Sequence, residues 1–197
     1  LFVCVLLGSL ATYPVSAQSP APAFETAECP FEVPSGQTVE CGYLTVPEDR
    51  SDPDGATIRL AVAVLQSLNP DKAADPIVYL EGGPGGEPLE ALPLLFTRQY
   101  APMLENRDVI VLDQRGTGYS EPSLACPEYT QAVFDMLPKN MTSAESEATG
   151  NQALLACRDR LMKEGVNLDA YNSAQNAADI EALRQALGYD QINLYGI

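Results

Sequence analysis

Six consecutive residues combine a high glycine content with a position directly after an apolar run. The segment at 81–86 reads Glu-Gly-Gly-Pro-Gly-Gly and follows Ile-Val-Tyr-Leu at 77–80. Because glycine adopts backbone conformations closed to other residues, such a loop can turn neighbouring amide N–H groups toward one point, as stabilisation of an oxyanion requires. Pro84 has no N–H, so we expect the donor to be Gly82 or Gly83, with Gly83 preferred.

Two other interpretations of this loop are open. A cluster of glycine and proline is often a flexible surface turn. A phosphate-binding loop is disfavoured, because no lysine followed by Ser/Thr stands after the glycines and no G-x-G-x-x-G register fits.

The last three residues, Tyr195-Gly196-Ile197, match the approach to a nucleophile elbow. In that elbow a strand turns sharply into a helix, and a serine projects from the turn within a G-x-S-x-G pattern. Gly196 would be the first glycine, where the tight turn leaves no room for a side chain, and Ile197 the next residue. We therefore expect the nucleophilic serine to follow Ile197 immediately. An ordinary strand end is the alternative for these residues taken alone.

A third motif, Asp-Gln-Arg-Gly-Thr-Gly-Tyr-Ser at 113–120, follows another apolar run. We expect Asp113 and Arg115 to pair and to hold this loop beside the site, which is a structural role. Ser120 is expected to be a loop serine and not a nucleophile, because Pro122 replaces the final glycine of the elbow pattern.

Apolar patterns predict the strands that position these motifs. Segments at 39–46 and 58–64 are predicted to form an antiparallel pair, the second from its alternating pattern. Continuous apolar runs at 77–80 and 109–112 predict strands covered on both faces, as in a parallel sheet. The predicted fold class is α/β, in which an antiparallel pair precedes a mainly parallel sheet with crossover helices.

Two helices are predicted within a long crossover, and a third helix is predicted after it. A helical insertion is expected over about 122–168, with helical stretches near 128–137 and 143–163. A further helix begins at Ser173, its expected N-cap, and ends before Gly188, which suits the left-handed C-terminal position. A short buried strand is then expected at 192–195.

Four of the five cysteines are expected to form disulfides. Cys4 lies in the apolar N-terminal segment, which leaves Cys29, Cys41, Cys126 and Cys157 with three possible pairings. Chain order favours Cys29–Cys41 and Cys126–Cys157, the latter within the helical insertion. A zinc site is disfavoured, because the sequence has no C-x-x-C pair and no histidine. We expect no metal and no cofactor.

The first 17 residues predict a secretory signal peptide whose own start is not included. Leu1–Leu10 is uncharged and apolar, and Val15-Ser16-Ala17 fits a small-residue cleavage site. A membrane anchor is the alternative, but polar residues and proline interrupt the run well short of about 20 apolar residues. We expect cleavage after Ala17, a flexible lead-in over 18–37, a secreted or periplasmic (cell-envelope) location, and no stable membrane insertion after signal removal.

Composition limits the classes of partner. Hydrophobic residues make up 46% of the chain and charged residues 19%, which is typical of a globular protein. The net charge of −16 disfavours nucleic acid and anionic membranes as partners, because both require a basic surface.

Taken together, the three motifs resemble the α/β-hydrolase family of proline iminopeptidases and tripeptidyl aminopeptidases, from about residue 41 to residue 197. The resemblance implies the N-terminal, incomplete part of an α/β-hydrolase fold over 38–197, a serine nucleophile, and release of residues or short peptides from free N-termini. Gly82 and Gly83 match the oxyanion loop of the family, and Gly196-Ile197 match the start of its elbow. Glu81 departs from the family, since many members have histidine there.

The resemblance also implies that the serine, the acid, the catalytic histidine and most of the lid follow Ile197. The 197-residue chain is therefore expected to be inactive by itself. The expected partner is a peptide or small ester substrate. An esterase or lipase of the same fold is one alternative, and an exported binding module without catalysis is another.

Overall fold

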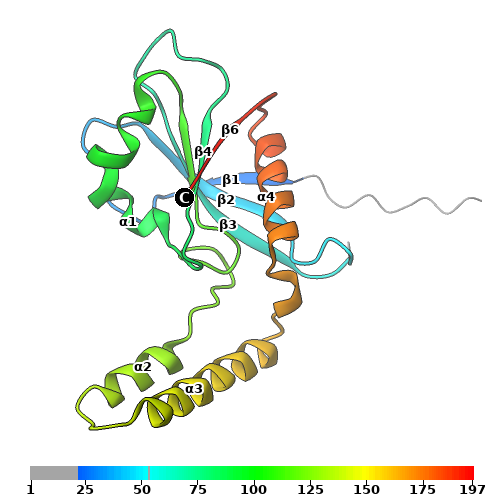
Figure 1. Cartoon of the computed structure of the whole chain (residues 1–197). Helices are drawn as coiled ribbons and strands as arrows, with labels where there is room; N and C mark the ends of the chain where they lie inside the picture. Colours follow the sequence, from blue (N-terminus) through cyan, green and yellow to red (C-terminus); the bar gives the residue numbers. More distant parts are fainter. Residues whose placement is uncertain (1–21, 53) are drawn as a thin grey trace, which may run out of the picture.

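The computed structural model describes residues 22–52 and 54–197 and places them around one six-stranded sheet (Figure 1). The strand order is β1-β2-β3-β5-β4-β6. Antiparallel pairing joins β1 to β2, β2 to β3 and β3 to β5, whereas β4 runs parallel to both β5 and β6. The strands are β1 (Ala23–Ala27), β2 (Val39–Pro47), β3 (Thr57–Leu65), β4 (Ile77–Leu80), β5 (Val109–Leu112) and β6 (Asn193–Gly196).

Helices cover both faces of this sheet, with α1 (Pro88–Leu95) and α4 (Ser173–Ala186) on opposite sides (Figure 1). Since successive strand residues point to opposite faces, β5 supplies Val109 and Val111 to the core beneath α1, and Ile110 and Leu112 to the core beneath α4. The two cores fix β4 and β5 in the centre, so the loops that follow these strands begin from rigid positions.

Short helical turns follow α1 and precede α4. They are a π-helical turn at Phe96–Tyr100 and 3₁₀ turns at Met103–Glu105 and Leu168–Ala170.

Two further helices form a hairpin that projects away from the sheet (Figure 1). They are α2 (Pro127–Met136) and α3 (Ser143–Lys163). Thr142 and Glu145 form a capping box at the start of α3, in which each side chain accepts a hydrogen bond from the other residue's backbone. This hairpin is the predicted helical insertion.

Both predicted disulfides are present. Cys29–Cys41 joins the segment after β1 to β2, and Cys126–Cys157 joins the residue before α2 to the middle of α3. The hairpin is therefore closed covalently near its base.

The predicted α/β class is confirmed: the described chain is an open, mixed sheet with helices on both faces. The predicted strands at 39–46, 58–64, 77–80 and 109–112 all occur with shifts of at most one residue at an end. Among residues 22–52 and 54–197, no helix is long and apolar enough to cross a membrane. The predicted signal peptide at 1–17, and residues 18–21 of the predicted lead-in, lie outside the described residues.

The structure corrects the prediction of a flexible lead-in over 18–37. Residues Ala23–Ala27 form β1, which pairs along its whole length with β2. Phe24 packs on the core beneath α4, and Gly42 of β2 allows this approach, because a Cβ there would lie 2.6 Å from the ring of Phe24. The segment has a single large apolar side chain, so its pattern alone did not predict a strand.

Two predictions near the end of the chain are also corrected. The N-cap of α4 is Asn172 and not Ser173, because the side-chain oxygen Oδ1 of Asn172 accepts hydrogen bonds from the N–H groups of Ala174 and Gln175. The strand predicted at 192–195 is β6, but its side chains are exposed, since it pairs only with β4 at the edge of the described sheet. Gly188 does adopt a positive φ of 75°, as its predicted C-terminal position requires.

Candidate active site

The glycine-rich loop and the end of the chain meet at one edge of the sheet. The parallel pairing of β4 with β6 places Leu80 beside Gly196, so the segments that follow both strands leave the sheet together. The N–H of Ile197 donates to Leu80 O over 3.2 Å. A Cβ added to Gly82 would lie 2.6 Å from Ile197 O, so only glycine fits there without a shift. The two predicted motifs, far apart in the sequence, are direct neighbours.

A cleft of about 980 Å³ opens beside this meeting point. One side is the whole glycine-rich loop, from Glu81 to Glu87, and the base is the loop after β5, from Gln114 to Thr117. The remaining wall consists of residues before and within the helical hairpin and near α4, namely Ser123, Leu124, Ala125, Leu154, Tyr171 and Asn176. A cleft of this size accommodates a small-molecule or short-peptide ligand.

The side chain of Glu81 holds the start of the loop. One of its carboxylate oxygens accepts a hydrogen bond from the Tyr79 hydroxyl (2.8 Å), and the other accepts from the N–H of Gly82 (3.2 Å). Its backbone carbonyl accepts from the side-chain amide of Gln114 (2.7 Å). Burial and the Glu81 carboxylate raise the pKa of Tyr79, which keeps the hydroxyl protonated as a donor. Three contacts therefore fix the peptide that leads into Gly83.

These contacts distinguish between the two candidate oxyanion donors, Gly82 and Gly83. The Gly82 N–H is already used by Glu81, whereas the Gly83 N–H donates to no acceptor among the described residues. Gly83 has a φ of 127°, a conformation that only glycine adopts readily. A hydrogen bond from the Gly86 N–H to Gly82 O (3.2 Å) closes the turn around it. Of the two glycines, Gly83 is therefore the one whose N–H is free to donate to an oxyanion.

Asp113 ties the loop after β5 to the start of α1. It is fully buried, and its carboxylate accepts hydrogen bonds from the N–H groups of Leu89 (3.1 Å) and Tyr119 (2.8 Å). Burial raises the pKa of Asp113 to about 6, since desolvation outweighs these two hydrogen bonds. Ser120 is buried beside it, donating to Asp113 O and accepting from Ala61 N–H, and is therefore a structural serine as predicted.

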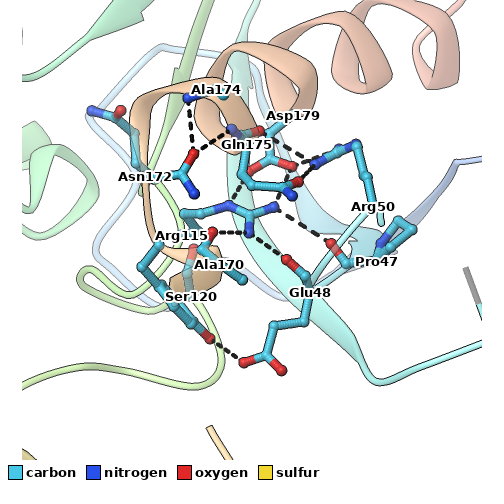
Figure 2. A network of polar contacts seen from close by, with 12 residues as sticks. Pro47, Glu48, Arg50, Arg115, Ser120, Ala170, Asn172, Ala174, Gln175 and Asp179 are labelled. Atoms are coloured by element: carbon cyan, nitrogen blue, oxygen red, sulfur yellow. Dashed lines mark hydrogen bonds and ion pairs between the residues drawn. The ribbon is translucent and has the colours of Figure 1, made fainter. Parts of the chain in front are cut away.

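Arg115 does not pair with Asp113, contrary to the sequence-based prediction. Its guanidinium forms two hydrogen bonds with the carboxylate of Asp179 in α4, at 2.7 and 2.8 Å (Figure 2). It also donates to the carbonyls of Glu48 (2.6 Å) and Ala170 (2.8 Å). The reason for the correction is that Asp113 is occupied by backbone donors, whereas Asp179 lies where the guanidinium reaches a full set of acceptors.

Asp179 and Arg50 complete this network, and the sequence reasoning missed both. Arg50 donates to Asp179 over 2.7 Å and to the side-chain oxygen of Gln175 over 2.9 Å (Figure 2). A signal was available: Asp179 stands four residues before Leu183 and thus on the buried face of α4, where a lone carboxylate requires a partner.

The described residues offer no group of three or more His, Cys, Asp or Glu side chains arranged to hold a metal ion. They do offer a cleft lined by the glycine-rich loop, and the end of β6 approaches that loop at Gly82.

A family model described as the alpha/beta hydrolase fold matches residues 75–197 of the 197-residue chain. The chain belongs to the α/β-hydrolase fold family. In this family the loop after one parallel strand and the elbow after its neighbour form the site. Here β4 and β6 are neighbouring parallel strands.

Curated relatives of this α/β-hydrolase chain include peptidases. The tripeptidyl aminopeptidase of Streptomyces lividans is 26% identical over 191 residues, covering 92% of this chain and 35% of the relative. The serine protease Hip1 of Mycobacterium tuberculosis is 29% identical over 173 residues, covering 84% of this chain and 32% of the relative. These relatives confirm the resemblance inferred from the motifs.

One relative carries a different name. Carboxylesterase B of Mycobacterium tuberculosis is 30% identical over 159 residues, covering 76% of this chain and 29% of the relative. The chain thus spans about a third of the length of the curated relatives it matches.

Proposed function

We propose that the full-length protein is a serine hydrolase of the peptidase type, which releases residues or short peptides from free N-termini. The observation that carries this proposal is the close approach of Ile197 to Gly82, a residue that lines the cleft. This approach supports a role for the free Gly83 N–H as a donor beside an elbow that begins at Gly196. Relatives named tripeptidyl aminopeptidase and serine protease support the peptidase reading.

The mechanism follows from this placement. A serine that follows Ile197 attacks the scissile carbonyl, with a histidine as base and a carboxylate that orients it, both outside this chain. The developing oxyanion accepts hydrogen bonds from the Gly83 N–H and from the N–H of the residue after the serine. Loss of one such donor typically costs about 3 kcal/mol of transition-state stabilisation. The 197-residue chain contains no histidine, and we propose that it is inactive alone.

Export to an oxidising compartment is part of the proposal. Two disulfides tie the chain together, and disulfides persist mainly in secreted and periplasmic proteins. The apolar segment at Leu1–Leu10 supports the same location.

An esterase is the second candidate, favoured by the relative named carboxylesterase B. A backbone oxyanion donor and a serine serve esters and amides alike, so the described geometry supports both reactions.

A substrate panel on the full-length protein tests the proposal. We expect cleavage of peptides with a free N-terminus, weak cleavage of the same peptides after N-acetylation, and slow hydrolysis of short-chain esters. Replacement of the serine after Ile197 by alanine is the control and should abolish every activity. Faster hydrolysis of esters than of any free peptide would favour the esterase, and an active alanine variant would overturn the serine mechanism.

A further inference from the structure

Part of the cleft lining outside the glycine-rich loop is apolar. Leu124 and Ala125, in the segment before α2, and Leu154 of α3 line the same cleft as Gly82 and Gly83. Leu154 is 45% exposed, so a large part of its side chain is available to a ligand. We call Leu124, Ala125 and Leu154 the apolar wall.

The apolar wall is held in place by contacts immediately behind it. The Cys126–Cys157 disulfide joins the residue after Ala125 to the residue three positions after Leu154, which is nearly one helical turn away. Arg160 of α3 donates to Ala125 O over 2.9 Å and to the Glu128 carboxylate over 2.6 Å. A covalent bond and a bridging arginine thus fix the loop segment to α3, which makes the wall a preorganised surface.

Charges in the cleft disfavour an acidic ligand beside this wall. Among its lining residues, Glu81 and Glu87 carry carboxylates, and the one basic residue, Arg115, is paired with Asp179. A carboxylate of the substrate buried there would be repelled by these two carboxylates, and no unpaired basic residue of the lining would balance its charge.

We propose that the apolar wall is a specificity subsite, which binds an apolar residue of the substrate close to the scissile bond, with Leu154 as its main determinant. This inference rests on the proposed hydrolase function and adds the class of substrate. The occupant is the substrate itself, because the wall is continuous with the candidate oxyanion loop in one cleft. An apolar side chain transferred from water onto this surface contributes binding energy that a polar side chain of equal size lacks.

The test uses the full-length protein and a matched pair of variants on one helix. Leu154→Asp places a charge in the cleft, whereas Leu155→Asp changes a neighbour of similar exposure (51%) that does not line it. Peptide substrates carry leucine or glutamine at each of the three positions before the scissile bond, and thermal unfolding checks that both variants fold.

At one of the three positions we expect Leu154→Asp to lower kcat/KM about 10-fold or more for the leucine substrate and less than 3-fold for the glutamine substrate. Leu155→Asp should leave kcat/KM unchanged for both the leucine and the glutamine substrate. Equal losses for both substrates, or equal effects of the two variants, would overturn the inference while leaving the hydrolase function intact.

A second measurement does not depend on turnover. A peptide that carries photo-leucine is crosslinked to the full-length protein, and the labelled residues are mapped by mass spectrometry. Label on the apolar wall supports the inference even if the wild-type protein cleaves no substrate, an outcome that would refute the proposed function alone. Label confined to other segments would overturn the inference.

Discussion

Arg115 and Asp179 are joined by two hydrogen bonds, of 2.7 and 2.8 Å, across 64 residues of sequence. Both side chains are at most 2% exposed. The pair ties the loop after β5, which forms the base of the cleft, to α4, the helix that leads into β6. The ion pair therefore links the base of the cleft to the helix that precedes the strand end at Gly196.

Removal of one partner of this pair should be strongly destabilising. Asp179→Ala leaves the Arg115 guanidinium buried without its counter-charge, for which we expect a loss of about 3–5 kcal/mol in the free energy of unfolding. Asp159→Ala, which breaks the exposed Arg158–Asp159 pair, is the control and should cost less than about 1 kcal/mol. Urea unfolding of the full-length protein measures both, and similar losses would show that the buried pair has no special role.

The N-cap of α4 gives a sharper comparison between adjacent residues. Asn172→Ala removes the acceptor of two backbone N–H groups and should cost about 1 kcal/mol. Ser173→Ala removes no capping contact and should stay within about 0.5 kcal/mol of the wild type. Thermal unfolding of the two variants decides between the sequence-based assignment and the structure, since the reverse order would restore Ser173 as the cap.

Asp113 should make stability fall as pH rises from about 4 to 6. Its pKa is about 6 in the folded state and has an ordinary value of 3.8 in the unfolded state, so the folded protein retains the proton over this window. The folded state then binds more protons than the unfolded state, which makes the slope of the unfolding free energy against pH negative. The difference between the folded-state and unfolded-state pKa values corresponds to a loss of about 3 kcal/mol in the free energy of unfolding across this pH range.

The variant Asp113→Asn isolates this contribution. Its amide cannot ionise, and in either orientation its NH₂ faces one of the two N–H donors, Leu89 or Tyr119, so the variant is destabilised. We expect the stability gap between wild type and Asp113→Asn to narrow as pH rises from about 4 to 6 and to stay constant above about 7. Urea unfolding at several pH values measures the gap. A gap independent of pH would contradict the raised pKa.

Much of the sheet could be predicted from the sequence, because alternating and continuous apolar runs mark strands irrespective of their partners. The glycine-rich loop and the segment ending at Ile197 were also identified before their proximity was known. β1 was missed, since it depends on one phenylalanine and on space left by Gly42 in another strand.

The polar network was largely beyond sequence reasoning. A carboxylate on the buried face of a helix, such as Asp179, is expected to have a charged partner. Which arginine is that partner depends on where the loop after β5 lies in the folded protein. Asp113 and Arg115 are two residues apart, and the prediction that they pair rests on this proximity. In the structure Asp113 accepts from backbone N–H groups, and Arg115 pairs with Asp179 of α4. The sequence likewise did not reveal that Glu81 accepts the Gly82 N–H.

Glu81 should affect turnover more than substrate binding. Glu81→Ala removes the acceptors of the Gly82 N–H and the Tyr79 hydroxyl and loosens the loop that presents Gly83. We expect kcat of the full-length protein to fall about 10- to 100-fold with little change in KM, because a small misplacement of a transition-state donor is costly. Glu81→Gln retains an acceptor for Gly82 and should recover most of the activity. Equal kinetics for both variants would contradict the role of the Glu81 hydrogen bonds in positioning Gly83.

The central claim is that the Gly83 N–H and the residue after Ile197 act on one carbonyl. Its most direct test is a crystal structure of the full-length protein after reaction with a fluorophosphonate, whose tetrahedral phosphorus imitates the oxyanion intermediate. We predict a phosphorus adduct on a serine directly after Ile197, with a phosphonyl oxygen about 2.7–3.1 Å from the Gly83 nitrogen. An adduct on any other residue, or a phosphonyl oxygen held by other donors with Gly83 out of reach, would contradict the claim.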